Sequence, residues 1–144
     1  MYYLALRYPM TDGEHSTRDP VDELRRPRVV LADDHPAVLL AFARMLQATC
    51  DVVASVPNGA EAIQAVVTLR PDVLVVDLMM ADMDGLEVCR SVRDVAPETA
   101  VIIVTAFEDA QVRKIALRDG ARDFVPKAQA SDMLENAIRR LSST

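Results

Sequence analysis

Five polar side chains of this sequence could form one reactive site, because each stands directly after a short apolar run or beside another such residue. They are the carboxylates Asp33, Asp34 and Asp77, the hydroxyl of Thr105 and the ammonium of Lys127. Clustered carboxylates repel one another unless a cation lies among them, and Mg²⁺ is a hard ion that joins carboxylates to phosphate oxygens. Asp77 could then attack an activated phosphoryl group while Lys127 neutralises the phosphoryl oxygens and Thr105 donates a hydrogen bond. The product would be an aspartyl phosphate.

Each of these residues, taken alone, also has a simpler explanation. Either of the first two carboxylates could cap the helix that follows, the third could bond its own loop, the hydroxyl could cap a helix, and the ammonium could be solvated. We favour a shared site, since four independent coincidences at four strand ends of one sheet would otherwise be needed. For Asp82 and Asp84, which lie in the loop after the third strand, capping or turn chemistry is the better explanation.

Alternating strand and helix signals run from Arg28 to the end of the chain. The expected strands are about 28–34, 51–56, 72–77, 100–105 and 123–127. The expected helices are about 36–48, 59–69, 85–95, 108–119 and 132–141. Asn58 with Glu61, Asp84, and Ser131 are the expected N-terminal caps, and Gly120 suits a left-handed C-terminal cap.

Strands that are apolar at nearly every position, and that are joined by helices, predict a parallel sheet covered on both faces. Right-handed crossovers with one reversal of direction make this a doubly wound α/β fold with the strand order 2-1-3-4-5. Strands one and three are then neighbours. Their carboxyl ends would bring Asp33, Asp34 and Asp77 within a few ångströms of one another.

Composition limits the functions that are open to the chain. It has 144 residues and a net charge of −6, which argues against direct binding to duplex nucleic acid. Cys50 and Cys89 are expected to be buried thiols, and His15 and His35 are expected to form no cluster. No segment suits a membrane span or a secretory signal, so we expect a cytoplasmic protein.

Residues 1–27 mix prolines and charges of both signs, which indicates a flexible N-terminal extension before a single domain at 28–142. Tyr2, Tyr3, Leu4, Leu6 and Tyr8 could form a small adhesive patch, but a partly ordered tail is the preferred interpretation.

The order and spacing of Asp33-Asp34-His35-Pro36, Asp77, Met83-Asp84-Gly85, Thr105-Ala106 and Lys127 resemble the receiver domains of two-component response regulators. The stretches 30–36 and 120–124 are most similar to the LuxR-type, NarL-like subgroup. The resemblance implies a flavodoxin-like (βα)5 fold and a phosphoacceptor role for Asp77. It also implies that the donor is a phosphohistidine on a sensor histidine kinase or phosphotransfer protein.

The same resemblance implies a role for each other residue of the site. Asp34 would be a direct Mg²⁺ ligand, Asp33 would act largely through water, and the backbone carbonyl of Met79 would be a further ligand. Thr105 and Lys127 would contact the phosphoryl group. Phosphorylation would draw Thr105 inward and let Phe124 fill the vacated space, which would change the face made by the fourth helix, the fifth strand and the fifth helix.

Several positions depart from the usual family pattern. Ala81 and Ala128 stand where proline is common, so a rigid loop and a cis bond are not assumed, and Phe124 replaces a frequent tyrosine. Met79 and Phe107 are apolar where a polar group could orient a hydrolytic water. We therefore predict slow self-dephosphorylation.

The first helix is more apolar than one buried stripe requires, which favours either kinase docking or cover by neighbouring segments.

Two rival functions do not fit the sequence. A flavin-binding module would need a phosphate-binding loop after strand one, where this chain has two carboxylates, and a phosphohydrolase would need a second aspartate where Met79 stands. The remaining alternative is a receiver-like protein-binding module that works without phosphorylation.

The output of the switch is expected outside this chain. NarL-like regulators typically continue into a helix-turn-helix domain, whereas only 17 residues follow Lys127 here. We therefore expect either a stand-alone receiver or a fragment of a transcription factor, with transcription controlled through an output domain or partner that is not in this chain. The resemblance is also compatible with a homodimer.

Overall fold

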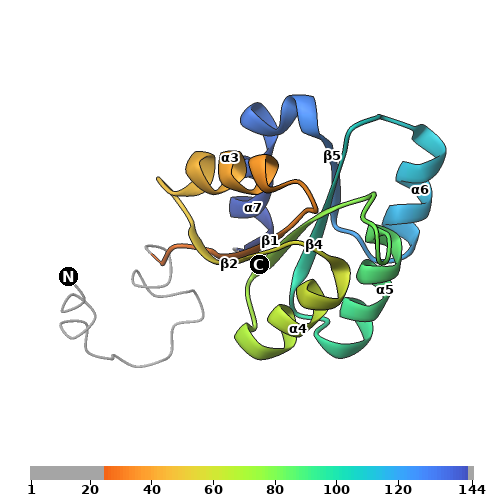
Figure 1. The fold of residues 1–144 in the computed structure, drawn as a ribbon, viewed down its shortest axis with the longest axis horizontal. Helices are drawn as coiled ribbons and strands as arrows, with labels where there is room; N and C mark the ends of the chain where they lie inside the picture. The colour runs from red at the N-terminus through yellow and green to blue at the C-terminus, as the bar shows by residue number, and fades with distance from the viewer. Residues whose placement is uncertain (1–24, 143–144) are drawn as a thin grey trace, which may run out of the picture.

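A computed structural model describes residues 25–142 of the chain. It contains a five-stranded parallel sheet in the order β2-β1-β3-β4-β5, as the sequence predicts (Figure 1). The strands are β1 (Arg28–Ala32), β2 (Asp51–Val56), β3 (Val73–Asp77), β4 (Ala100–Thr105) and β5 (Asp123–Pro126). The helices are α3 (Pro36–Leu46), α4 (Gly59–Leu69), α5 (Gly85–Val95), α6 (Ala110–Arg118), the 3₁₀ turn η1 (Lys127–Gln129) and α7 (Ala130–Ser142).

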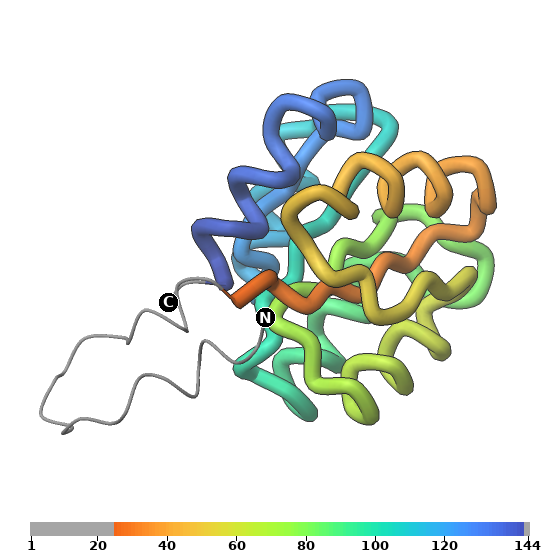
Figure 2. The backbone as a smooth tube through the Cα atoms, turned by 90° about the vertical axis from the view of Figure 1, so that its left-hand side faces the viewer, coloured from red at the N-terminus to blue at the C-terminus, as the bar shows by residue number. Residues whose placement is uncertain are grey.

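Helices cover both faces of the sheet, with α3 and α7 on one side and α4, α5 and α6 on the other (Figures 1 and 2). Alternate residues of β1 point to opposite faces. Val29 and Leu31 pack with α3 and α7, whereas Val30 and Ala32 pack with the other helices. All residues of β3 and β4 are buried, and each buried Val, Leu or Ile side chain contributes roughly 1.5–3 kcal/mol of hydrophobic stabilisation. This two-sided burial explains the continuous apolar runs.

Most of the predicted helix ends are confirmed. The Asn58 side chain accepts the backbone N–H of Glu61, and Asp84 forms a reciprocal capping box with Glu87. Gly120 has φ +114°, which agrees with its predicted role after the fourth helix. The two capping side chains mark where α4 and α5 begin, and the positive φ of Gly120 marks where α6 ends.

The predicted N-terminal cap of the last helix is wrong. Ser131 lies inside α7, because η1 continues without a break into a helix that begins at Ala130. Chain that is already turning in a 3₁₀ conformation needs no separate capping residue at that point. The first helix also ends at Leu46, two residues earlier than predicted, and the fourth begins at Ala110, where Asp109 is its cap.

At the edge of the sheet where the strands begin, arginine side chains cap two helices. Arg26 donates to the carbonyls of Gln47, Ala48 and Cys50 after α3, and Arg28 donates to those of Leu69 and Arg70 after α4. Cationic side chains at helix C-termini satisfy free carbonyls and oppose the negative end of the helix dipole. Sequence periodicity alone does not reveal these contacts.

Cys50 and Cys89 are free and buried, as predicted, and burial raises the pKa of the Cys89 thiol to about 11.

None of the helices between residues 25 and 142 has the length and apolar character that a bilayer crossing needs. The adhesive patch considered for Tyr2 to Tyr8, most of the extension and His15 lie outside the described residues.

Candidate functional site

Sheet register brings the predicted polar residues to one edge. Ala32 pairs with Val76, so the residues after them, Asp33 and Asp77, lie at the same level of the sheet. Asp77 in turn pairs with Val104, the residue before Thr105. Thr105 pairs with Pro126, which Lys127 follows. The carboxyl ends of four strands therefore place these groups at a single edge, as the strand order predicts.

Lys127 lies between two buried carboxylates. Its Nζ is 2.9 Å from Asp33 Oδ2 and 3.3 Å from Asp77 Oδ1, and the lysine side chain is 20% exposed. The simpler explanation of Lys127 as a solvated strand end is therefore wrong. The side chain connects the end of β5 to the ends of β1 and β3.

The surroundings of Asp77 disfavour the ionised form of its carboxyl group. Burial raises the pKa of its carboxyl, and the neighbouring Asp33 raises it further, while Lys127 and the backbone N–H of Met79 lower it. For Lys127, burial lowers the pKa, but the bond to Asp33 and the charge of Asp77 outweigh burial and raise the pKa overall. A cation in addition to Lys127 would stabilise the ionised form of Asp77.

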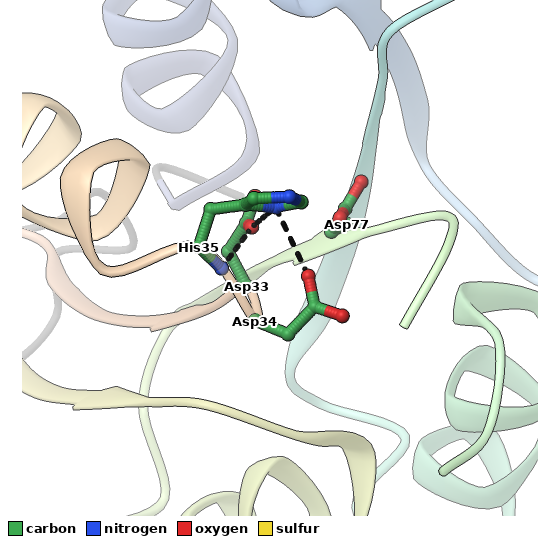
Figure 3. A group of neighbouring side chains, drawn as sticks. All are labelled: Asp33, Asp34, His35 and Asp77. Carbon is green, nitrogen blue, oxygen red and sulfur yellow. Dashed lines mark hydrogen bonds and ion pairs between the residues drawn. The ribbon is translucent and has the colours of Figure 1, made fainter. Parts of the chain in front are cut away.

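His35 joins this group, contrary to the prediction that it forms no cluster. Its Nδ1 lies 3.1 Å from Asp33 Oδ1 and 3.0 Å from Asp34 Oδ1 (Figure 3). The backbone N–H of His35 also donates to Asp33 Oδ1, at 2.9 Å. The prediction failed because it looked for other histidines and cysteines at ligand spacing, whereas the contacts here are with the two preceding carboxylates.

The donor atoms of this acidic site fit a divalent cation. One ligand atom from each of Asp33, Asp34, His35 and Asp77 can be chosen so that all four lie within 4.8 Å of one another. Three of the four are carboxylate oxygens, which suit Mg²⁺, and one is an imidazole nitrogen. Figure 3 shows the three side chains of residues 33–35 facing Asp77 across the edge of the sheet.

The two residues expected to act as a switch have different surroundings. Thr105 Oγ1 donates to the carbonyl of Phe107 and accepts its backbone N–H, at 2.9 and 3.2 Å, so the hydroxyl bonds its own loop. Phe124 is fully buried. Arg113 of α6 covers the Phe124 ring, with 5.9 Å between the guanidinium carbon and the ring centroid, and donates to the Phe124 carbonyl. The aromatic side chain is thus already inward while Thr105 bonds locally.

Two residues near the end of the loop after β3, Asp82 and Gly85, determine how it packs. Asp82 accepts the backbone N–H groups of Gly59 and Ala60 at the start of α4, and these bonds lower the pKa of its carboxyl. At Gly85, an added Cβ would lie 2.8 Å from the Asp77 carbonyl oxygen, so only glycine lets α5 begin this close to β3. The turn or capping interpretation of Asp82 is confirmed, although the helix it caps is distant in sequence. Gly85 is a positioning residue whose close approach sequence reasoning missed.

Apolar side chains are exposed two residues after Asp77 and two residues after Thr105. Met79 is 70% exposed and Phe107 is 81% exposed. On α3, most of the large apolar residues are buried or half-buried against the α3/α7 side of the core, and Leu40 remains 53% exposed. Cover by the domain itself thus accounts for most of the apolar character of α3.

Comparison with known proteins identifies one family throughout. A model described as the response regulator receiver domain matches residues 29–139. The oxygen regulatory protein NreC from Staphylococcus aureus is 37% identical over 115 residues, which cover 78% of this chain and 53% of that protein. Response regulator MprA from Mycobacterium ulcerans is 35% identical over 114 residues, with coverage of 79% and 49%. The chain therefore spans about half the length of these relatives.

Solved structures agree with the sequence comparisons. The signal receiver domain of the response regulator NarL from Mycobacterium tuberculosis superposes with a TM-score of 0.79 at 29% identity, covering 83% of this chain and 98% of that one. A LuxR-family response regulator from Aurantimonas sp. gives a TM-score of 0.78 at 26% identity, covering 83% of this chain and 86% of that one. Both the fold and the NarL-like similarity are thereby supported.

Proposed function

Because this chain belongs to the response regulator receiver domain family, we propose that it is a Mg²⁺-dependent signalling switch whose phosphoacceptor is Asp77. The observation that supports this best is the geometry around Asp77. The carboxylate is buried at the end of β3, beside Asp33 and within 3.3 Å of the Lys127 ammonium. Such a carboxylate is held where phosphoryl oxygens would meet a fixed positive charge.

Asp33, Asp34, Asp77 and the backbone carbonyl of Met79 would hold the Mg²⁺. When bound, the ion supplies positive charge that offsets the clustered carboxylates and the phosphoryl oxygens. The raised pKa of Asp77, caused by burial and by Asp33, supports the need for such a charge. Lys127 supplies a second positive charge, which belongs to the protein itself.

In the proposed transfer, an Asp77 carboxylate oxygen bonds to phosphorus as the phosphorus–nitrogen bond of a phosphohistidine breaks. The donor imidazole leaves with the electron pair and takes a proton from water. Lys127 pairs with the phosphoryl oxygens, and the Thr105 hydroxyl turns from its own loop to donate to one of them. The domain catalyses its own phosphorylation and slow dephosphorylation and is a phosphoacceptor, not an enzyme that acts on a separate substrate.

We propose that the conformational response starts from a domain that is partly preset. Phe124 is buried and covered by Arg113 before any phosphoryl group is added. Movement of Thr105 toward Asp77 would therefore stabilise an aromatic position that is already occupied, and some activity without phosphorylation follows. The response would be read on the face formed by α6, β5 and α7.

The proposed partner is a sensor histidine kinase or phosphotransfer protein in the cytoplasm. Exposed Leu40 on α3, with Met79 and Phe107 near the acidic residues, would meet its apolar surface. Control of transcription would pass through an output domain or partner outside this chain, and a homodimer is compatible with that role.

Intact-mass measurement after incubation with acetyl phosphate tests the proposed function. Wild type should gain one phosphoryl group in Mg²⁺ and none in excess chelator, and Asp77→Asn should gain none. Asp94→Asn, which removes an exposed carboxylate of α5, is the matched control and should behave as wild type. If neither acetyl phosphate nor a phosphorylated kinase domain labels wild type, the phosphorylation-independent binding module is favoured instead.

A further inference from the structure

The two outer strands of the sheet differ in how they are protected against further pairing. β5 has four residues, its Pro126 has no backbone N–H to donate, and its Asp123 pairs with Arg140 of α7 at 3.0 Å. β2 has six residues, contains neither proline nor lysine, and has one charged side chain, that of Asp51. Because short length, proline and charge keep an edge strand from pairing, β2 is the less protected edge.

β2 is also incompletely covered. Figure 2 shows it between α3 and α4 on the side of the molecule that faces the viewer, and within residues 25–142 no strand pairs with its outer side. Every residue of β2 is half-buried or exposed, whereas all residues of β3 and β4 are buried. Val53 is an extra residue in the ladder and has no partner residue in β1. β2 can therefore accept a further strand.

The chain enters the domain beside the start of β2. The Asp51 N–H donates to the Pro27 carbonyl at 2.8 Å, and the Arg26 guanidinium donates to the carbonyls of Ala48 and Cys50, just before β2. Neighbouring strands lie about 4.8 Å apart, so a strand outside β2 would be roughly 10 Å from β1. The residues before Arg25 are therefore attached close to the open edge.

Residues 2–8 have the sequence pattern of a strand with one apolar face. Every second residue is a tyrosine or a leucine, which defines a Tyr/Leu face: Tyr2, Leu4, Leu6 and Tyr8. A period of two is that of side chains along a strand, and aromatic residues favour strands. A flexible stretch as long as residues 9–24 spans roughly 20–24 Å on average, which exceeds the distance to be crossed.

Charge and chain direction favour the same orientation for an added strand. A strand antiparallel to β2 ends where β1 and β2 begin, which is where the chain must continue to Arg25. In that orientation Arg7, the one charged residue of the segment 2–8, lies beside Asp51. The Asp51 side chain is 61% exposed, with its contact to Arg26 at 3.8 Å, so it can pair with a second cation. A parallel strand would place Arg7 near Val56, where β2 has no charge.

We propose that residues 2–8 add to β2 of the same chain as an antiparallel sixth strand. The Tyr/Leu face lies on the α4 side of the sheet, because Val53, Ala54 and Val56 pack with that part of the core, whereas Ser55 is exposed. The added strand supplies hydrogen-bond partners for β2 and covers an edge that would otherwise pair with other chains. Antiparallel edge strands are common on parallel sheets.

Hydrogen exchange of the full chain tests the proposal. The β2 amides that do not bond β1 should exchange at least about tenfold more slowly in wild type than in the double variant L4K/L6K, because the added strand accepts their hydrogen bonds. The double variant V21K/L24K makes the same change of charge outside the segment 2–8 and should exchange as wild type does. Unchanged exchange in β3 checks that each variant keeps the fold. Equal β2 exchange in wild type and L4K/L6K would overturn the proposal.

Isotope-filtered NMR identifies the occupant of the edge. Contacts of the Leu4 and Leu6 methyl groups with those of Val53 and Val56 should appear within one labelled chain and be absent between labelled and unlabelled chains in a mixture. Contacts between chains would identify a second copy as the occupant, and an absence of contacts would leave the edge uncovered. Either result would refute the proposal. Neither experiment uses phosphorylation, so the outcome is independent of the proposed function.

Discussion

The charge imbalance at the site predicts that removing the Asp77 carboxylate stabilises the metal-free protein. Asp33, Asp34 and Asp77 place three acidic groups around one ammonium, and burial together with Asp33 raises the pKa of Asp77. An acid whose pKa is raised in the folded state costs no stability below its unfolded pKa, about 3.8 here, and costs increasingly more as the pH rises through the folded value. Asp77→Asn should therefore melt higher than wild type at pH 7 without metal, and the two should converge below pH 4.

Mg²⁺ should act in the opposite direction, because it should stabilise wild type more than Asp77→Asn. A ligand at one hundred times its dissociation constant stabilises a protein by about 2.7 kcal/mol, which corresponds to roughly 10 °C for a domain of this size. Loss of one carboxylate ligand weakens binding on the order of 10- to 100-fold, so at the same concentration the variant gains only about 0.4–1.4 kcal/mol. Wild type gains about 1.3–2.3 kcal/mol more than the variant.

Thermal and urea denaturation, each with and without Mg²⁺, measure both effects. Asp94→Asn has the same change of charge at an exposed position of α5 and should follow wild type in every condition. A metal-free Asp77→Asn that melts below wild type at pH 7 would refute the argument from burial and repulsion. Equal Mg²⁺ stabilisation of wild type and Asp77→Asn would refute the assignment of Asp77 as a ligand.

Three further predictions concern residues around the site. Gly85→Ala should destabilise the domain by roughly 1–3 kcal/mol and slow the phosphorylation of Asp77, because the new Cβ would displace the β3 end; unchanged urea midpoint and labelling rate would contradict this. Asp82→Ala should cost about 1 kcal/mol at pH 7 by removing the acceptor at the α4 N-terminus. Since the folded pKa of Asp82 is lowered, its contribution is present above the unfolded value and is lost as the pH falls through the folded one, so the two melting curves should converge in acid. The polar substitutions Met79→Asn and Phe107→Glu should shorten the lifetime of the phosphoryl group, which can be followed by intact mass after the donor is removed. A wild-type lifetime as short as minutes would contradict the argument that apolar Met79 and Phe107 slow hydrolysis.

The sheet and most of the site were predictable because they depend on patterns that are local in sequence. Continuous apolar runs identify buried parallel strands, and right-handed crossovers with one reversal of direction are compatible with the order 2-1-3-4-5 that the structure has. Polar residues that end those runs must then meet at one edge. Asp33, Asp77, Thr105 and Lys127 all lie at that edge for this reason.

The features that the sequence did not predict depend on contacts between distant segments, or on local geometry that a residue pattern does not encode. Capping or turn chemistry was predicted for Asp82 and is confirmed, but only the folded chain shows that the helix it caps is α4, more than twenty residues earlier. The closeness of Gly85 to the Asp77 carbonyl depends on how α5 packs beside β3. Ser131 has the residue type of a cap, yet a preceding 3₁₀ turn makes a cap unnecessary. His35 was dismissed because its partners are its own sequence neighbours.

The simpler local explanations and the shared site are compatible. Asp33 accepts the backbone N–H of His35 two residues on, and Thr105 bonds the backbone of Phe107 in the same way. These bonds orient side chains that also belong to the strand-end cluster. Local capping chemistry therefore positions the groups for the proposed phosphoryl transfer.

Chemical mapping of the phosphorylated residue tests the central claim most directly. The protein would be labelled with acetyl phosphate in Mg²⁺ and reduced with borohydride, which converts an aspartyl phosphate to homoserine, and its peptides would be sequenced by mass spectrometry. The account predicts homoserine at position 77 and none at Asp33 or Asp34. Homoserine at another position, or labelled protein without homoserine, would contradict Asp77 as the phosphoacceptor.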